Sequence, residues 1–171
     1  MAVAELFLMH AADFLEGHYL PKIEQCVAIL KEEDLWWRPN EQSNSIANLI
    51  LHLSGNTRQW IISGVGGGTD DRKRQEEFNV REGMSGNDLT ELLRSTVTRA
   101  CAILRTLDAS SLESRRHIQH KEVSTLYAVF HVVEHFSMHT GQIIALAKEK
   151  GAKDLKFYAF EGGRPMERWR K

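Results

Sequence analysis

The chain has 171 residues, and its 22 lysines and arginines nearly balance its 23 aspartates and glutamates. A chain of this length is expected to form one domain, here residues 1–171, with a core of its own. The balanced charge gives no electrostatic reason to bind nucleic acid or an anionic membrane, so neither is expected as a partner.

The N-terminal segment and the cysteines indicate a cytoplasmic protein. Residues 1–20 carry three acidic side chains among their apolar positions, which fits neither a signal peptide nor a membrane span. Cys26 and Cys101 are far apart in the sequence and form no paired motif. We therefore expect reduced thiols and no disulfide.

Apolar residues at helical spacing predict a first helix over residues 2–31. Pro21 has no amide hydrogen, and its ring would clash with the carbonyl group of Gly17, so this helix is expected to bend between the two residues. Residues 32–44 are predicted to be irregular, with their adjacent tryptophans packed over one end of the domain.

A second helix is predicted from about Ser45, as a capping residue, to Ser63, with His52 on its apolar face. The glycines that begin at Gly64 favour a mobile loop, and charged residues extend this loop to Gly86. Connections of about twenty residues are usually functional lids, crossovers or disordered segments.

The second half of the chain predicts two more helices. The third is expected from Asn87 or Asp88 to Leu107, and the fourth from its cap Ser124 to Lys150. The polar segment between them carries two histidines that lie on no apolar face and are expected at the surface, His117 and His120. Residues 154–171 form a tail whose aromatic residues could dock on the helices: Phe157, Tyr158 and Phe160.

Four long amphipathic helices predict an all-α fold, because no segment alternates apolar and polar residues as a strand would. The expected architecture is a four-helix bundle. Short connections make helices one and two antiparallel neighbours, and likewise helices three and four. The long loop after Ser63 leaves room for a crossover.

The fourth helix carries histidines on one stripe, at His131, His135 and His139. Burying these imidazoles without partners would cost on the order of 1–3 kcal/mol each, so a divalent cation is the expected partner. His52 is the candidate third ligand. Spacing alone allows either His131 with His135 or His135 with His139. Three protein ligands leave coordination positions open, which is typical of a catalytic site.

Three other interpretations compete with this one. Residues 131–135 match H-x-x-E-H, a zinc peptidase signature in which Glu134 would be the general base. Only 36 residues follow His135, too few for such a peptidase. The histidines could instead form a hydrogen-bonded core without metal. No carboxylate lies on their stripe, and this lack of a general base supports a third alternative, metal binding without turnover.

The segments DLWWRPN (34–40), NSIANLILHLSGN (44–56) and HFSMHTGQI (135–143) resemble the DinB/YfiT-like superfamily. More narrowly they resemble its DUF1572 branch, and residues 72–78 are similar to the Arg-rich, Glu-Phe loop of that branch. The resemblance covers most of the chain in the same order. It implies a DinB-like bundle with up-down-down-up connectivity, and a homodimer.

The resemblance also implies a site. Its three ligands would be His52, His135 and His139, with His131 as a neighbour, and the metal Zn²⁺, Ni²⁺, Fe²⁺ or Mn²⁺. Many relatives have arginine where this chain has Thr140, so any role of that arginine is absent here. The expected function is activation of a low-molecular-weight thiol, as in an S-transferase, or of water, as in a hydrolase. The alternative is a non-catalytic metal-binding or stress-related interaction protein. No catalytic residue is assigned.

Overall fold

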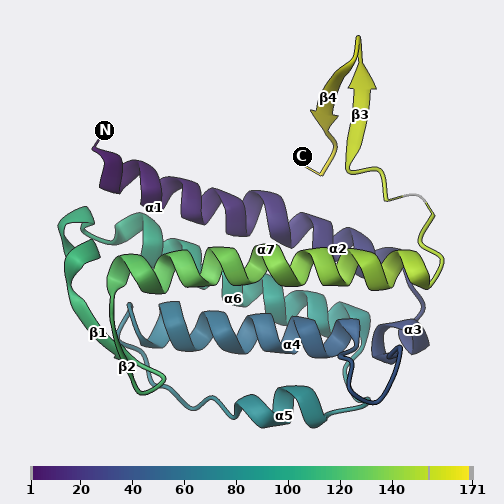
Figure 1. Ribbon diagram of the computed structural model, residues 1–171, viewed down its shortest axis with the longest axis horizontal. Coiled ribbons are helices and arrows are strands. Elements are labelled where there is room, and N and C mark those ends of the chain that lie inside the picture. Colours follow the sequence, from purple (N-terminus) through teal and green to yellow (C-terminus); the bar gives the residue numbers. More distant parts are fainter. Residues whose placement is uncertain (1, 154, 170–171) are drawn as a thin grey trace.

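The structure is a computed structural model that describes residues 2–153 and 155–169 (Figure 1). Most of it is helical, which confirms the predicted fold class at that level. The long helical segments lie side by side in Figure 1. They are α1 (Val3–Asp13), the π-helical turn η1 (Phe14–Tyr19) and α2 (Leu20–Ile29) in succession, then α4 (Ile46–Thr57) with the π-helical turn η2 (Arg58–Ser63), α6 (Gly86–Thr106) and α7 (Thr125–Glu149).

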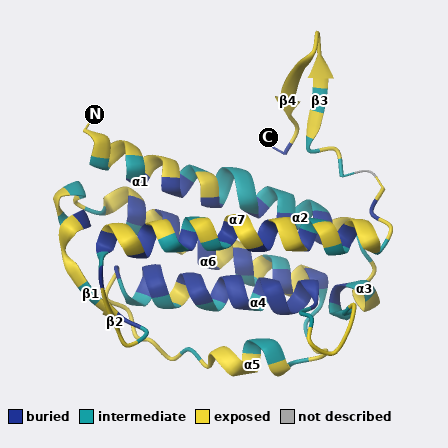
Figure 2. Cartoon of the chain, viewed as in Figure 1, coloured by how far each residue is buried: buried dark blue, intermediate teal, exposed yellow. Residues whose placement is uncertain are grey.

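The core lies between these helices, and α4 is the most deeply buried of them (Figure 2). Ser45 caps α4 by accepting a hydrogen bond from the backbone N–H of Asn48, and the Asn48 side chain accepts in return from the backbone of Ser45. Ser124 caps α7 by accepting a hydrogen bond from the backbone N–H of Tyr127, and Gly151 follows that helix with a φ of +93°. Both predicted caps and both predicted helices are confirmed.

The first helix is irregular in the region where a bend was predicted. Residues Phe14–Tyr19 form a π-helical turn, so the hydrogen-bond pattern shifts just before Pro21, which lies at the start of α2. The third long helix begins earlier than predicted. Its cap is Ser85, whose side chain accepts a hydrogen bond from the backbone of Asp88. The Gly86 N–H donates to the carboxylate of Glu32, a contact from a distant segment that the local sequence did not reveal.

Several short elements were not predicted. The segment expected to be irregular contains α3 (Glu32–Trp36), and the long loop contains α5 (Arg74–Asn79). The polar segment before α7 contains the turn η3 (Ala109–Glu113) and two antiparallel strands, β1 (Arg115–Ile118) and β2 (Lys121–Ser124). The tail contains a second hairpin of β3 (Tyr158–Glu161) and β4 (Arg164–Glu167).

The expectation that no strand forms was therefore wrong. Each strand has only four residues, too few to show an alternating pattern. The first hairpin turns at Gln119 and His120, which both have positive φ. A turn of this kind is usually recognised by glycine or asparagine, and neither is present here. The surface positions predicted for His117 and His120 are confirmed, since both are exposed.

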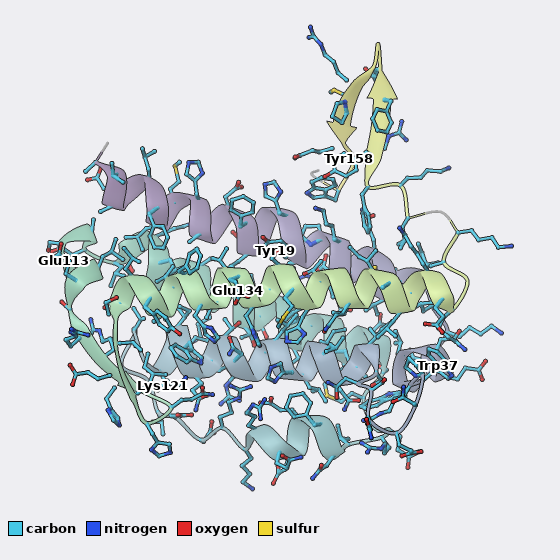
Figure 3. The ribbon with its side chains drawn as sticks, viewed as in Figure 1. Tyr19, Trp37, Glu113, Lys121, Glu134 and Tyr158 are labelled. Carbon is cyan, nitrogen blue, oxygen red and sulfur yellow. The ribbon has the colours of Figure 1, made fainter. Side chains whose placement is uncertain are left out.

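Of the three tail residues expected to dock, one does so, and a fourth aromatic residue that was not predicted is buried as well. Phe157 packs against the core, but Tyr158 and Phe160 are exposed, the latter by 73%. Trp169 is only 3% exposed, and the Lys22 ammonium lies 3.8 Å from the centre of its ring. The hairpin itself stands away from the helices, with Tyr158 labelled at its base in Figure 3. Among the described residues, every helix is too short or too polar to cross a lipid bilayer.

Candidate metal centre

Three histidines from two helices meet between α4 and α7. His52 comes from α4, and His135 and His139 come from successive turns of α7. Each offers one ring nitrogen, and these nitrogens lie within 4.8 Å of one another. Nitrogens bound to one tetrahedral Zn²⁺ at about 2.0–2.1 Å would be roughly 3.3 Å apart, so small side-chain shifts suffice to share a cation.

The closest approach is between His52 and His135, whose Nε2 atoms are 2.8 Å apart. Two unprotonated nitrogens repel each other at this distance unless one carries a proton or a cation lies between them. The rings of the three histidines meet edge to face, with centroids 4.4–5.2 Å apart. The lone pairs can therefore converge without the rings stacking.

The second nitrogen of His52 is held by the loop that precedes α6. Nδ1 of His52 lies 2.9 Å from Oε2 of Glu77, which is on α5. Arg72 binds both carboxylate oxygens of Glu77, through Nε at 2.7 Å and Nη2 at 2.8 Å. Burial alone would raise the pKa of Glu77, but hydrogen bonds from Arg72 and His52 lower it overall. An ionised carboxylate can only accept, so its contact with His52 requires the proton of a neutral imidazole on Nδ1, and Nη2 of Arg72 lies 3.1 Å from the same nitrogen.

His139 is oriented within its own helix. Its Nδ1 donates to the side-chain oxygen of Gln142 at 2.7 Å, so Nε2 is the unprotonated nitrogen. This Nε2 is buried and has no hydrogen-bond partner in the described part of the chain. A buried acceptor without a partner costs free energy, and a cation satisfies it. The donor set therefore fits a metal ion.

The electrostatics favour neutral imidazoles at the centre. Burial, together with the neighbouring His139 and His52, lowers the pKa of His135 to about 3. Burial also lowers the pKa of His139, although the hydrogen bond to Gln142 opposes this. Metals bind the neutral form of histidine. Near neutral pH these side chains are already neutral, so metal binding requires no loss of a proton from them.

His131 lies beside the cluster, not within it. Its Nε2 is 3.3 Å from Nδ2 of Asn56, and its ring packs 4.3 Å from the centre of Trp60. Of the two pairs that spacing allowed on α7, the structure brings His135 and His139 together with His52. Glu134, labelled on α7 in Figure 3, is exposed, so the general base of the peptidase interpretation does not reach the histidines.

Sequence reasoning missed the partners of His52. The absence of a carboxylate was argued from the histidine stripe alone, but Glu77 arrives from the loop, accompanied by Arg72. Phe78 covers the other side, with its ring centre 4.6 Å from that of His52. Residues 72–78 were noted only as a point of resemblance, and no local pattern assigned them a role. A polar loop carries no periodicity that indicates which side chain turns inward.

Comparison with known proteins gives a family and a fold. A family model described as "Protein of unknown function (DUF1572)" matches residues 3–163. The crystal structure of a DinB-like protein from Bacillus cereus is similar, with 16% identity, a TM-score of 0.65, and coverage of 81% of this chain and 91% of that one. A DinB-like protein from Bacillus subtilis has 19% identity, a TM-score of 0.65, and coverage of 86% and 94%. Identities this low indicate a shared fold only, and no curated protein matches the chain.

Proposed function

The chain belongs to the DUF1572 family of DinB-like proteins, and from this membership and its converging imidazoles we propose that it is a metal-dependent enzyme. In this proposal the chain is a four-helix bundle of up-down-down-up connectivity. His52, His135 and His139 hold one divalent cation, of Zn²⁺, Ni²⁺, Fe²⁺ or Mn²⁺. The unpartnered, buried Nε2 of His139 is the observation that carries the proposal, because only a ligand satisfies it.

The chemistry follows from the ligand count. A cation with three protein ligands has open positions, and it lowers the pKa of a thiol or water bound there. The residues of this chain hold and shield that position. Phe78 lies against the His52 ring, and Trp60 and His131 pack beside the cluster, while His135 is only partly buried and leaves access from solvent. We favour transfer of a low-molecular-weight thiol over hydrolysis, by analogy with the superfamily alone.

A second candidate is a metal-binding protein without turnover. It is favoured by the state of Glu77, whose two oxygens are engaged by Arg72 and His52 and so are not available to accept a proton from a substrate. Glu134 is exposed on α7 and is not at the site either. A bound cation would lower the pKa of water and of a thiol alike, and in either case the proton would pass to solvent, so the engaged state of Glu77 does not distinguish hydrolysis from thiol transfer.

The experiment has two stages. Untagged protein is purified without chelator, its metal content is measured by elemental analysis, and each candidate divalent metal is titrated into the chelator-treated protein. Loaded protein is then incubated with bacillithiol, mycothiol or glutathione and an electrophilic probe. We expect one metal per chain and thiol consumption above background that requires His135. Stoichiometric metal without turnover by any thiol supports the second candidate, and no metal uptake rejects both.

A further inference from the structure

We propose that Glu77 is a positioning residue for the metal ligand His52, and that Arg72 holds Glu77 in place. This inference rests on the proposed metal site and deepens it. It assigns a role to the loop between η2 and α6, which contributes no metal ligand of its own. The loop reaches the site through His52, whose Nδ1 lies 2.9 Å from Oε2 of Glu77 and 3.1 Å from Nη2 of Arg72.

The three side chains form one buried polar unit. The Arg72 side chain is 4% exposed and that of Glu77 is 12% exposed, values that are unusual for charged residues in a surface loop. Arg72 binds both oxygens of Glu77, and its Nη1 donates to Oε1 of Gln59 at 3.0 Å. Gln59 Oε1 also accepts from the Gln119 side chain of the first hairpin. The guanidinium is therefore fixed by groups from several elements.

This arrangement determines which nitrogen of His52 is available. A carboxylate paired with arginine only accepts hydrogen bonds, so the proton of a neutral His52 lies on Nδ1. Nε2 then carries the lone pair and faces His135 and His139. A carboxylate on the far nitrogen also makes imidazole a stronger donor to a metal, and loss of such a group typically weakens metal binding by about 10–100-fold.

Gly55 shows that α4 accommodates this unit closely. A Cβ atom at this position would lie 1.9 Å from Oε1 of Glu77 and 3.0 Å from Nε of Arg72. Any other residue at position 55 would force the ion pair to move. Gly55 is one turn after His52 on α4, so the helix presents the ligand and the space for its partners together.

The far end of the same loop is anchored by other residues, which supplies a control. Arg38 donates to the backbone carbonyls of Phe78 and Val80, and the Asn48 amide donates to those of Glu77 and Val80. Substituting Arg38 loosens the loop without removing the partner of His52. A loss of metal affinity caused by loop anchoring alone would therefore appear in an Arg38 variant as well.

The first test is metal affinity, measured by competition with a chromophoric chelator, together with the absorption spectrum of the Co²⁺-loaded protein. We expect Glu77→Gln and Glu77→Ala to bind Zn²⁺ about 10–100-fold more weakly and to show an altered Co²⁺ spectrum. Arg38→Gln and the exposed control Glu76→Gln should stay within about threefold of the original chain. Equal losses in the Arg38 and Glu77 variants, or none in either, would overturn the proposal.

The second test needs no metal, so it separates this inference from the proposed function. Long-range ¹H–¹⁵N correlation spectra of the chelator-treated protein report which nitrogen of His52 is protonated. We expect Nδ1–H in the original chain and in Arg38→Gln, and a shift towards Nε2–H in Glu77→Ala. His52 found as Nε2–H in the original chain rejects the positioning role even if the protein binds metal. Failure to bind metal with the expected tautomer rejects only the proposed function.

Discussion

The two helices that carry the histidines and the loop that covers them are built on opposite principles. In α4, ten of twelve residues are buried, whereas α5 in the loop buries none of its own six. The helices are held by apolar packing, and the loop is held at the site by a buried ion pair and backbone hydrogen bonds. The three clustered histidines come from the packed part, and the carboxylate that contacts one of them comes from the polar part.

Functional residues can be recognised from sequence in the helices but not in the loop. Packed helices impose a period of 3.6 residues, so a histidine that falls on the apolar stripe is visible as an exception. A loop held by polar contacts imposes no period, so Glu77 is not distinguished by spacing from Glu76, which is exposed. If the helices bind the metal and the loop orients His52, substitutions in the two regions should have different effects.

The largest effect is expected from removing a ligand. His52→Ala should lower metal affinity by more than about 100-fold, beyond the loss typical for an outer-shell group, because one of three imidazoles disappears. Calorimetric titration of the chelator-treated protein with Zn²⁺ measures it, and circular dichroism confirms the helix content. His117→Ala, an exposed histidine on β1, is the matched control and should bind normally. Unchanged affinity in His52→Ala would refute the site.

Glycine substitutions compare the two regions directly. Gly55→Ala gains helix propensity but displaces the Glu77 carboxylate, since the new Cβ would lie 1.9 Å from Oε1. We expect a net loss of about 1–2 kcal/mol in the free energy of unfolding and weaker metal binding. Gly141→Ala on α7 meets nothing within 4 Å and should gain about 0.5–1 kcal/mol with unchanged affinity. Urea denaturation measures the free energy of unfolding of both variants. Equal effects would show that Glu77 does not pack closely against α4 at Gly55.

Much of the fold and most of the histidine cluster could be predicted for the same reason. The caps Ser45 and Ser124 are side chains with a local function, and the apolar stripes behind them are long enough to fix helix type. Spacing left two histidine pairs open on α7. The resemblance to the DinB-like superfamily selected His135 and His139, and the structure places these two with His52.

What could not be predicted depends on contacts distant in sequence. The start of α6 is fixed in part by Glu32, which accepts from the N–H of Gly86 fifty-four residues later. Trp169 is buried against Lys22 of α2. Nothing near Trp169 in the sequence distinguishes it from Phe160, which is exposed. The same holds for Arg72 and Glu77. Long-range polar and aromatic contacts carry no local signature.

The histidine helices and the loop are expected to affect the free energy of unfolding in different pH ranges. The folded-state pKa values of His135 and His139 lie below the usual 6.5, so the unfolded chain binds more protons below that pH. The free energy of unfolding of the metal-free protein should therefore fall as pH drops from about 7.5 to 5.5, by at most about 1.4 kcal/mol per pH unit for each histidine. Glu77 has a lowered pKa, so its contribution is present above about 4.5 and is lost only at lower pH.

Denaturant titrations in the presence of a chelator at the two pH values measure this fall. His135→Asn removes one titrating group from the histidine helices and should reduce the difference between the two pH values. His120→Asn, in the exposed turn of the first hairpin, should leave it unchanged. A fall that appears only below pH 4.5 would place the sensitivity in the loop and contradict the assignment.

The smallest effect is expected at His131, and it bears on the ambiguity that spacing left open. His131 shares the stripe of His135 and His139. Its side chain, however, contacts Asn56 and Trp60 and lies outside the histidine cluster. His131→Gln should change metal affinity by less than about threefold and cost about 1 kcal/mol of stability through the lost contact with Asn56. The same chelator competition measures it. A loss as large as that of His52→Ala would mean that the cation is bound one turn earlier on α7, by the pair that the helical period equally allows.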